Sequence, residues 1–289
     1  LACGDVRCGE CDAALATGGN VNYFPDMFAV LSGFKEHLGR CYSFDHRASG
    51  FVASEGCVGV TFDRSEREGS VLSTRARVLC STTRCAGASA SLTAPNRDSQ
   101  VELLRGAWHS AGRAPDAVEA HGAGTPLGDP IEVQATLVAM PEGEQRLCIG
   151  SLKAHVGHLL PSSGVAALVK SAFMLSHNEV CQNALLRVLN PSCAMLHGCA
   201  ERLAFPTALG RIRRHGVPLT CGVTNIAYSG QLVHFVIEPG LPNRWRRATA
   251  LVSLRRRHFA IGDGHVTKAR CGHQAVPTAT CRDGLAVGH

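Results

Sequence analysis

Short apolar segments alternate with amphipathic segments along most of this chain, and this alternation restricts the folds that it can adopt. The longest amphipathic segment covers about 158–176 and repeats apolar residues at helical spacing: Val165, Leu168, Val169, Ala172 and Phe173. Further helices are predicted over 99–111 and 130–139, and strands within 44–62 and over 11–22, 76–81, 118–120, 147–151, 217–224 and 232–237. Strands that alternate with helices favour an α/β sheet covered on both faces.

The length of the chain and its first residues limit what surrounds this sheet. A chain of 289 residues with 45% apolar residues can bury a large core, as one large domain or two small ones. It contains no uncharged apolar run of about 18 residues, and it opens with neither Met nor a basic, apolar signal pattern. We therefore expect no membrane partner and a cytoplasmic location, and the start resembles an internal position of a longer protein.

The positive charge is concentrated at the C-terminal end. Residues 241–289 hold nine of the 29 Lys and Arg residues and two of the 23 acidic residues, a net charge of +7 that leaves −1 for residues 1–240. Because the first 240 residues are nearly neutral, a nucleic-acid partner is not expected. The sequence pattern also becomes irregular after 240, so we predict one domain over 1–240 and a basic linker or disordered tail over 241–289.

The cysteines do not indicate a disulfide framework or a metal site. Fourteen cysteines are dispersed through an ordinary apolar pattern, which predicts that most are reduced and buried. Cys8 and Cys11 have the spacing of half a zinc site, but no second pair follows to complete four ligands. We predict no metal.

The segment VEAHGAGTPLGDPIE, residues 118–132, places His121 between a predicted strand and a glycine-rich turn. A side chain at that point lies at the edge of an α/β sheet, where ligands usually bind. Asp129 and Glu132 flank Pro130 in the pattern of a capping box, which predicts a structural role at a helix start. The glycine spacing fits neither the dinucleotide nor the phosphate-loop pattern.

A second loop has the same arrangement. SLKAHVGH, residues 151–158, runs from a predicted strand through a glycine into the longest helix and carries Lys153, His155 and His158. A third loop, 225–230, could approach the same sheet edge. Two alternatives remain open from the pattern: His155 and His158 form local hydrogen bonds at a helix start, or they bind a metal together with a cysteine.

These residues occur in segments that resemble one family. VEAHGAGTPLGDPIE, GSLKAHVGHLLPSSGVAALVK and CGVTNIAYSGQLVHFVIE resemble, in order and spacing, three signature segments of β-ketoacyl synthases, and GECDAALATGG and CYSFDHRASGFVASEGCVGV match two more. The similarity covers about residues 3–240. SLTAPNRDSQ and the basic segment after residue 244 are most similar to the ketosynthase domains of large type I polyketide or fatty-acid synthases.

The resemblance implies a thiolase-like fold, an α/β fold layered α-β-α-β-α, of which this chain holds the second half and the end of the first. It implies catalytic roles for His121, His158 and Lys153. The family nucleophile is a cysteine that would precede residue 1, so the chain alone is expected to be inactive. Cys3 is no substitute in the sequence pattern, because no helix start is recognisable after it.

The reaction that the resemblance implies is a decarboxylative Claisen condensation of an acyl thioester with malonyl-acyl carrier protein. An enolate formed from the malonyl unit needs hydrogen-bond donors fixed in advance, which two neutral imidazoles can provide. Lys153, as a nearby cation, would disfavour protonation of an imidazole. The resemblance places Thr125 and Gly230 near the phosphopantetheine arm of the carrier protein and Tyr228 at a gating position.

The implied partners are an acyl carrier protein, neighbouring synthase domains and a second copy in a homodimer, with no cofactor bound directly. The sequence also departs from the family pattern, at Ala123, at Ala154 and His155, and at Gln231 and Leu232. The last pair removes small polar groups from the glycine loop. A second hypothesis is therefore a non-catalytic, condensing-like module that serves as a scaffold or in dimerisation.

Overall fold

The computed structural model describes residues 2–22, 39–64, 75–87, 95–143, 146–212 and 217–240, and the backbone of 260–262 and 265–267. Contacts divide the chain into two compact units, Leu1–Arg244 and Trp245–His289. In the second unit, strands β9 (Ala260–Gly262) and β10 (His265–Thr267) form an antiparallel pair. The predicted linker or tail over 241–289 stays a prediction.

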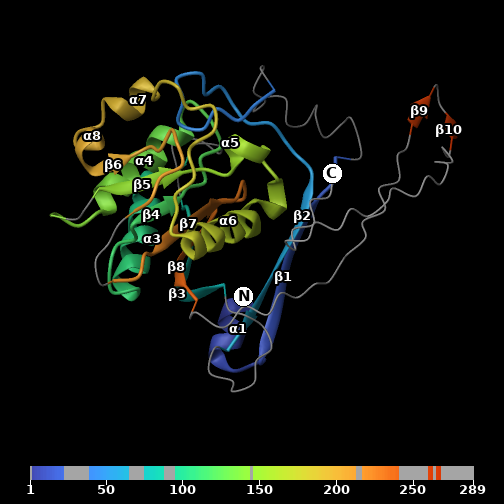
Figure 1. Cartoon of the computed structure of the whole chain (residues 1–289), viewed down its shortest axis with the longest axis horizontal. Coiled ribbons are helices and arrows are strands. Elements are labelled where there is room, and N and C mark those ends of the chain that lie inside the picture. The colour runs from blue at the N-terminus through green and yellow to red at the C-terminus, as the bar shows by residue number, and fades with distance from the viewer. Residues whose placement is uncertain are drawn as a thin grey trace, which may run out of the picture. The chain divides into compact units, whose positions relative to one another are not determined.

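A six-stranded sheet is the centre of the first unit (Figure 1). Its strands, in spatial order, are β3 (Ala76–Cys85), β8 (Gln231–Pro239), β7 (Cys221–Ile226), β4 (Ala117–Glu119), β5 (Leu147–Gly150) and β6 (Leu203–Ala204). Strands β7, β4, β5 and β6 are parallel, whereas β3, β8 and β7 pair antiparallel. The parallel strands bring the predicted loops after β4 and β5 to the same edge of the sheet.

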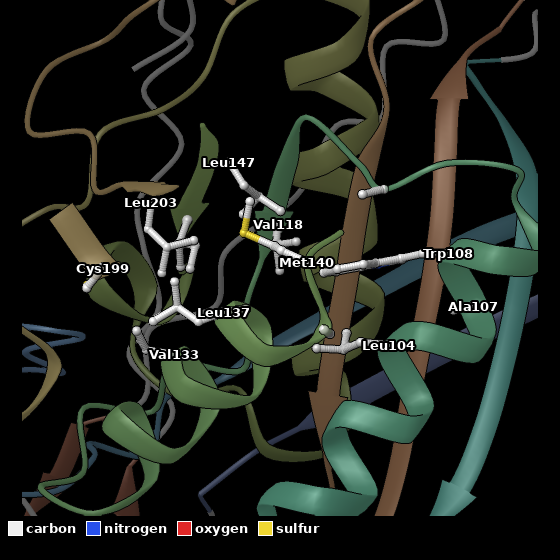
Figure 2. Close-up of a cluster of buried hydrophobic side chains, with 14 of the residues drawn as sticks. Leu104, Ala107, Trp108, Val118, Val133, Leu137, Met140, Leu147, Cys199 and Leu203 are labelled. Atoms are coloured by element: carbon white, nitrogen blue, oxygen red, sulfur yellow. The ribbon is translucent and has the colours of Figure 1, made fainter. Parts of the chain in front are cut away.

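Helices α3 (Arg97–Ser110) and α4 (Gly128–Ala139) cover one face of this sheet. Their buried side chains, among them Leu104, Trp108 and Val133, pack on residues of the central strands (Figure 2). Asn96 caps α3, since its side-chain oxygen accepts the Ser99 N–H at 3.0 Å. The predicted α/β architecture is confirmed on this face.

Helix α6 (Ser163–His177) covers the other face, where Ala167, Met174 and Leu175 are buried against β7 and β8. Beyond α6 lies an antiparallel ribbon of β1 (Ala13–Asn20) and β2 (Gly56–Asp63). The short helix α1 (Ala2–Cys8) packs on this ribbon. The sequence pattern did not predict α1, which begins at Ala2, one residue before Cys3.

The predicted helix over 158–176 was wrong at its start. The chain instead forms the short helix α5 (Lys153–Val156), then a 3-10 turn over Leu160–Ser162, and α6 begins only at Ser163. Gly157 separates these pieces with a φ of +78°, and a Cβ there would lie 3.0 Å from Ser54 Cβ. This break turns His158 out of any helix. Two short helices, α7 (Pro191–Ala194) and α8 (Cys199–Arg202), were not predicted either.

A fully buried histidine, His234 on β8, lies under α3. The Trp108 indole N–H donates to His234 Nε2 at 3.1 Å, and Thr224 Oγ1 lies 2.9 Å from His234 Nδ1. Because an indole N–H can only donate, the ring proton is on Nδ1 and is donated to the Thr224 hydroxyl. Burial lowers the pKa of His234 to about 3, so this histidine is neutral in the folded chain.

We expect His234 to make stability pH-dependent. The unfolded chain binds a proton at His234 below its ordinary pKa of 6.5, but the folded chain does not until about pH 3. Stability is therefore full above pH 6.5, and the free energy of unfolding falls by up to about 1.4 kcal/mol per pH unit below it. Urea unfolding at pH 7.5, 6 and 5 should show this slope reduced in His234→Gln. The slope should persist in His109→Gln, which changes an exposed histidine, and equal slopes in all three proteins would contradict the assignment.

Candidate functional site

His121 is the second residue after the end of the buried strand β4. The next residue, Gly122, has a φ of +40°, and a Cβ there would lie 2.7 Å from Ser151 Cβ and 2.9 Å from Phe44 Cζ. Only glycine fits this position, because the backbone is left-handed and the space is occupied. The chain therefore turns sharply and holds the imidazole at the sheet edge, as the glycine hinge predicted.

Two buried carboxylates hold this turn. Glu132 accepts the N–H groups of His121 and Gly122 at 2.7 and 2.8 Å. Asp129 accepts the N–H groups of Gly124 and Phe44 at 3.0 and 2.7 Å. These contacts show that the capping-box prediction was wrong. Helix α4 begins at Gly128 after Leu127, which makes no side-chain cap, and both carboxylates bond to loops instead of to the helix start.

Burial raises the pKa of both carboxyl groups. Desolvation is the largest cause in each case, and the pKa of Asp129 rises to about 7 despite the N–H groups that it accepts. For Glu132, the N–H groups of Gly122 and His121 and the nearby Lys153 ammonium oppose the effect of burial. The turn that carries His121 thus depends on carboxylates that are desolvated but fully hydrogen-bonded.

The second predicted loop reaches the same place. Lys153 is buried at the start of α5, and its Nζ donates to the His121 carbonyl oxygen at 2.5 Å. His158 lies after Gly157, and its ring is 5.5 Å from the His121 ring between centroids, at an angle of 77°. The structure therefore brings His121, Lys153 and His158 together from two loops, with His121 and Lys153 32 residues apart in the chain.

Each imidazole is fixed by a backbone donor on Nδ1. The Ile226 N–H donates to His121 Nδ1 at 3.2 Å, and the Leu160 N–H donates to His158 Nδ1 at 3.0 Å. Because Nδ1 accepts in both rings, a neutral ring must carry its proton on Nε2. Both rings are only partly buried. Two Nε2–H donors are thus available at one site.

Burial and Lys153 keep both rings neutral. The pKa of His121 lies well below 6.5, first because of burial and then because of the positive charges of Lys153 and, when protonated, His158. Burial followed by the Lys153 charge lowers the pKa of His158 to about 3. The pKa of Lys153 is itself lowered by burial, although the nearby carboxylates of Glu132 and Glu119 oppose this effect. At neutral pH the site therefore contains two uncharged imidazoles beside one lysine.

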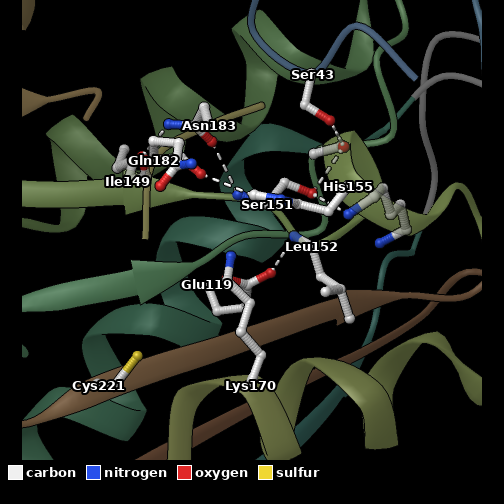
Figure 3. Close-up of polar contacts among 12 residues, drawn as sticks. Ser43, Glu119, Ile149, Ser151, Leu152, His155, Lys170, Gln182, Asn183 and Cys221 are labelled. Carbon is white, nitrogen blue, oxygen red and sulfur yellow. Dashed lines mark hydrogen bonds and ion pairs between the residues drawn. The ribbon is translucent and has the colours of Figure 1, made fainter. Parts of the chain in front are cut away.

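Side chains from several segments fix the backbone of the loops after β4 and β5 (Figure 3). The hydroxyls of Ser43 and Ser151 donate to the Gly122 carbonyl at 2.6 and 3.0 Å. Below them, the buried Glu119 accepts the Leu152 N–H and pairs with Lys170 Nζ at 2.6 Å. These contacts connect the ends of β4 and β5, so the two histidine-bearing loops are held as one unit.

The other predicted residues have different surroundings. His155 is exposed, and its Nε2 lies 2.8 Å from the Gln182 carbonyl, so it is not part of this pair. Tyr228 is 75% exposed in the turn between β7 and β8. Gly230 closes that turn by donating to the Ala227 carbonyl at 2.9 Å. Thr125 accepts the Gly128 N–H through its hydroxyl at 3.0 Å, a structural contact at the start of α4.

Sequence reasoning missed the groups behind the two rings. Asn225 and Ile226 contact His121 Nδ1, and Ser163 Oγ lies 3.0 Å from His158 Nδ1. The only sequence signal for Asn225 and Ile226 was the position of the third loop after a strand. Within the described residues no cluster of three or more His, Cys, Asp or Glu side chains could hold a metal ion. The alternative of a metal site at His155 and His158 therefore has no support in that part of the chain.

Two family models match the chain. The N-terminal domain of β-ketoacyl synthases matches residues 1–68, and the C-terminal domain matches residues 75–186. The second match contains His121, Lys153 and His158. The chain belongs to the β-ketoacyl synthase family. Its mixed α/β architecture is that of the thiolase-like fold of ketosynthases.

Relatives of this ketosynthase chain include large synthases. Highly reducing polyketide synthase 40 of Fusarium mangiferae is 36% identical over 82% of the chain, and mycoketide-CoA synthase of Mycobacterium tuberculosis is 36% identical over 84%. The chain spans 10% and 6% of those two proteins. It is thus similar to a ketosynthase domain of type I polyketide synthases.

Solved structures show the same likeness. The ketosynthase from module 6 of the bacillaene synthase of Bacillus subtilis has a TM-score of 0.77 and 28% identity, over 82% of this chain. The oxazolomycin ketosynthase domain of Streptomyces albus has a TM-score of 0.76 and 30% identity, over 83%. The chain spans 44% of each of those structures. Among the described residues, no helix is long and apolar enough to span a bilayer.

Proposed function

We propose that this chain provides the two-histidine half of a ketosynthase active site, in a protein that carries out decarboxylative condensation of an acyl thioester with malonyl-acyl carrier protein. The pair of neutral imidazoles supports this function most directly. His121 and His158 each accept a backbone N–H on Nδ1, which leaves Nε2–H as the donor. Donors fixed in advance stabilise a developing enolate oxygen without reorganisation during the reaction.

Lys153 supports this chemistry without touching the reacting atoms. Its ammonium group bonds to the His121 carbonyl and opposes protonation of both rings. Loss of CO2 from a malonyl thioester leaves an electron pair on the carbon and oxygen of an enolate. The two Nε2–H donors would stabilise that oxygen, and the enolate carbon would then attack the acyl thioester carbon and release the nucleophile's sulfur.

The nucleophile of this reaction is proposed to lie outside these 289 residues. Among the described cysteines, Cys41 lies near Lys153. However, Cys41 is only 2% exposed, and its sulfur accepts the Val52 N–H at 3.2 Å. Burial raises the pKa of the Cys41 thiol. A protonated, buried thiol is a poor nucleophile.

The relatives are multidomain synthases, and this supports an acyl carrier protein and neighbouring synthase domains as partners. The phosphopantetheine arm would carry the substrate, with no cofactor bound directly. Thr125, Tyr228 and Gly230 stay predicted contacts of that arm. A homodimer and a cytoplasmic location also stay predictions.

The experiment measures CO2 release from malonyl-pantetheine by the ketosynthase that contains this segment together with the rest of the family domain. We expect release above the uncatalysed rate without an acyl donor, since decarboxylation requires only the donors at the two rings. Binding of the thioester without CO2 release would contradict the proposal and favour the scaffold hypothesis.

A further inference from the structure

Asn225 lies behind the ring of His121. Its side-chain Oδ1 is 3.4 Å from His121 Nδ1, the nitrogen that also accepts the Ile226 N–H at 3.2 Å. Both separations are long for hydrogen bonds, as expected when two groups share one lone pair. Two neighbouring residues of β7 thus face the same ring nitrogen.

His158 shows the same arrangement with different groups. Its Nδ1 accepts the Leu160 N–H at 3.0 Å and lies 3.0 Å from the Ser163 hydroxyl, which can rotate to donate. Each imidazole therefore meets one backbone N–H and one side chain at Nδ1. The Asn225 side chain contacts His121 Nδ1 in the same way that the Ser163 hydroxyl contacts His158 Nδ1.

The amide of Asn225 can present either of its ends to the ring, because its oxygen and nitrogen exchange places by a rotation of the side chain. His121 Nδ1 accepts the Ile226 N–H, so this nitrogen carries a lone pair and no proton in the neutral ring. It therefore cannot donate to the amide oxygen of Asn225, whereas the NH2 group of Asn225 can donate to it. We propose that Asn225 is a positioning residue that, together with the Ile226 N–H, holds His121 in the tautomer whose proton is on Nε2.

The surroundings of Asn225 hold its side chain in place. A Cβ on Gly164 would lie 3.2–3.5 Å from the Asn225 side chain, so the amide packs directly on the first turn of α6. Side chains alternate along a strand, and Thr224 faces the opposite side, where it pairs with His234 under α3. The end of β7 is thus anchored on both faces of the sheet.

Two substitutions change what Asn225 offers to the ring. Asn225→Asp presents only acceptor atoms, so it should move the proton of neutral His121 to Nδ1 and raise the pKa of His121. Lys153 and His158 face the same ring and oppose its protonation in every variant. Asn225→Leu keeps the size of the side chain but removes its donor. Only the Ile226 N–H then favours the tautomer with the proton on Nε2, and we expect the population of the other tautomer to increase.

The test uses nitrogen NMR of the 289-residue chain labelled at histidine. In the unchanged chain, His121 should show an unprotonated Nδ1 and a protonated Nε2, and the Asp variant should show the reverse at neutral pH. His158 is the internal control, because its Nδ1 partners are unchanged. The proposal is overturned if both variants keep the original His121 tautomer and titration while His158 is undisturbed. If the Asp variant does not fold, the Leu variant alone decides.

The consequence for catalysis rests on the proposed function. In the complete ketosynthase, the decarboxylation rate of the Asn225→Asp variant should fall about tenfold or more at pH 8, because His121 Nε2 then carries no proton to donate. The reference is the complete loss of one oxyanion donor, which lowers a rate by about 10²–10³. The rate should recover as the pH is lowered, because a protonated imidazole donates from both nitrogens. If the NMR result holds but the unchanged enzyme releases no CO2, the proposed function fails and the assignment of Asn225 stands.

Discussion

Replacing His121 or His158 by Ala should lower malonyl decarboxylation in the complete ketosynthase by about 10²–10³, the usual cost of one preorganised donor to a developing oxyanion. Each substitution removes one Nε2–H and leaves the other ring in place. The N–H groups of Ile226 and Leu160 lose their acceptor. Both residues are partly exposed, so water can replace the lost imidazole. CO2 release from malonyl-pantetheine measures the effect.

His155→Ala is the matched control. This histidine is in the same loop as His158, three residues away, but it is exposed and bonds to the Gln182 carbonyl. Its removal should change decarboxylation less than twofold, within the small effect typical of exposed positions. Full turnover in His121→Ala or His158→Ala would refute the proposed enolate role, and an equal loss in His155→Ala would show that the effect comes from disturbance of the loop.

Gly122→Ala should destabilise the chain by about 2–5 kcal/mol, the sum of a left-handed backbone penalty and overpacking. Its Cβ would lie 2.7 Å from Ser151 Cβ and 2.9 Å from Phe44 Cζ, neither of which can move without shifting a buried loop. The Gly122 N–H also bonds to Glu132, so a shift here displaces His121. Urea unfolding of the 289-residue chain measures the loss.

Gly112→Ala separates the two causes. Gly112 has a φ of +77°, but a Cβ at this position would meet no atom within 4 Å, so only the backbone penalty of about 1–2 kcal/mol applies. Equal losses in the two variants would mean that the contacts with Ser151 and Phe44 contribute nothing.

The order of strands and helices followed from the sequence because each element has its own periodicity. The spacing of apolar residues placed β4, β5, α3 and α4 to within a few residues. The start of α6 was placed five residues too early, since the apolar pattern continues through Pro161 although the α-helical backbone begins only at Ser163. Periodicity records which face of a segment is buried, not whether its backbone hydrogen bonds are continuous.

The capping box shows a related limit. Asp129 and Glu132 have the residue types and the spacing of a helix start, and local sequence cannot distinguish a carboxylate that bonds to its own helix from one that bonds to a neighbouring loop. In the folded chain the N–H groups of Gly122 and His121 lie within reach of Glu132, and that of Phe44 within reach of Asp129. The partners of a buried carboxylate are set by packing between segments.

The sequence by itself determined the family signature, the alternation of strands and helices, and the two loops that carry His121, Lys153 and His158. Only the tertiary structure decided that the two rings lie 5.5 Å apart and that each accepts a backbone N–H on Nδ1. The reason is physical. The donors to His121 come from β7, more than 100 residues away in the chain, and parallel strand pairing alone brings that strand beside β4.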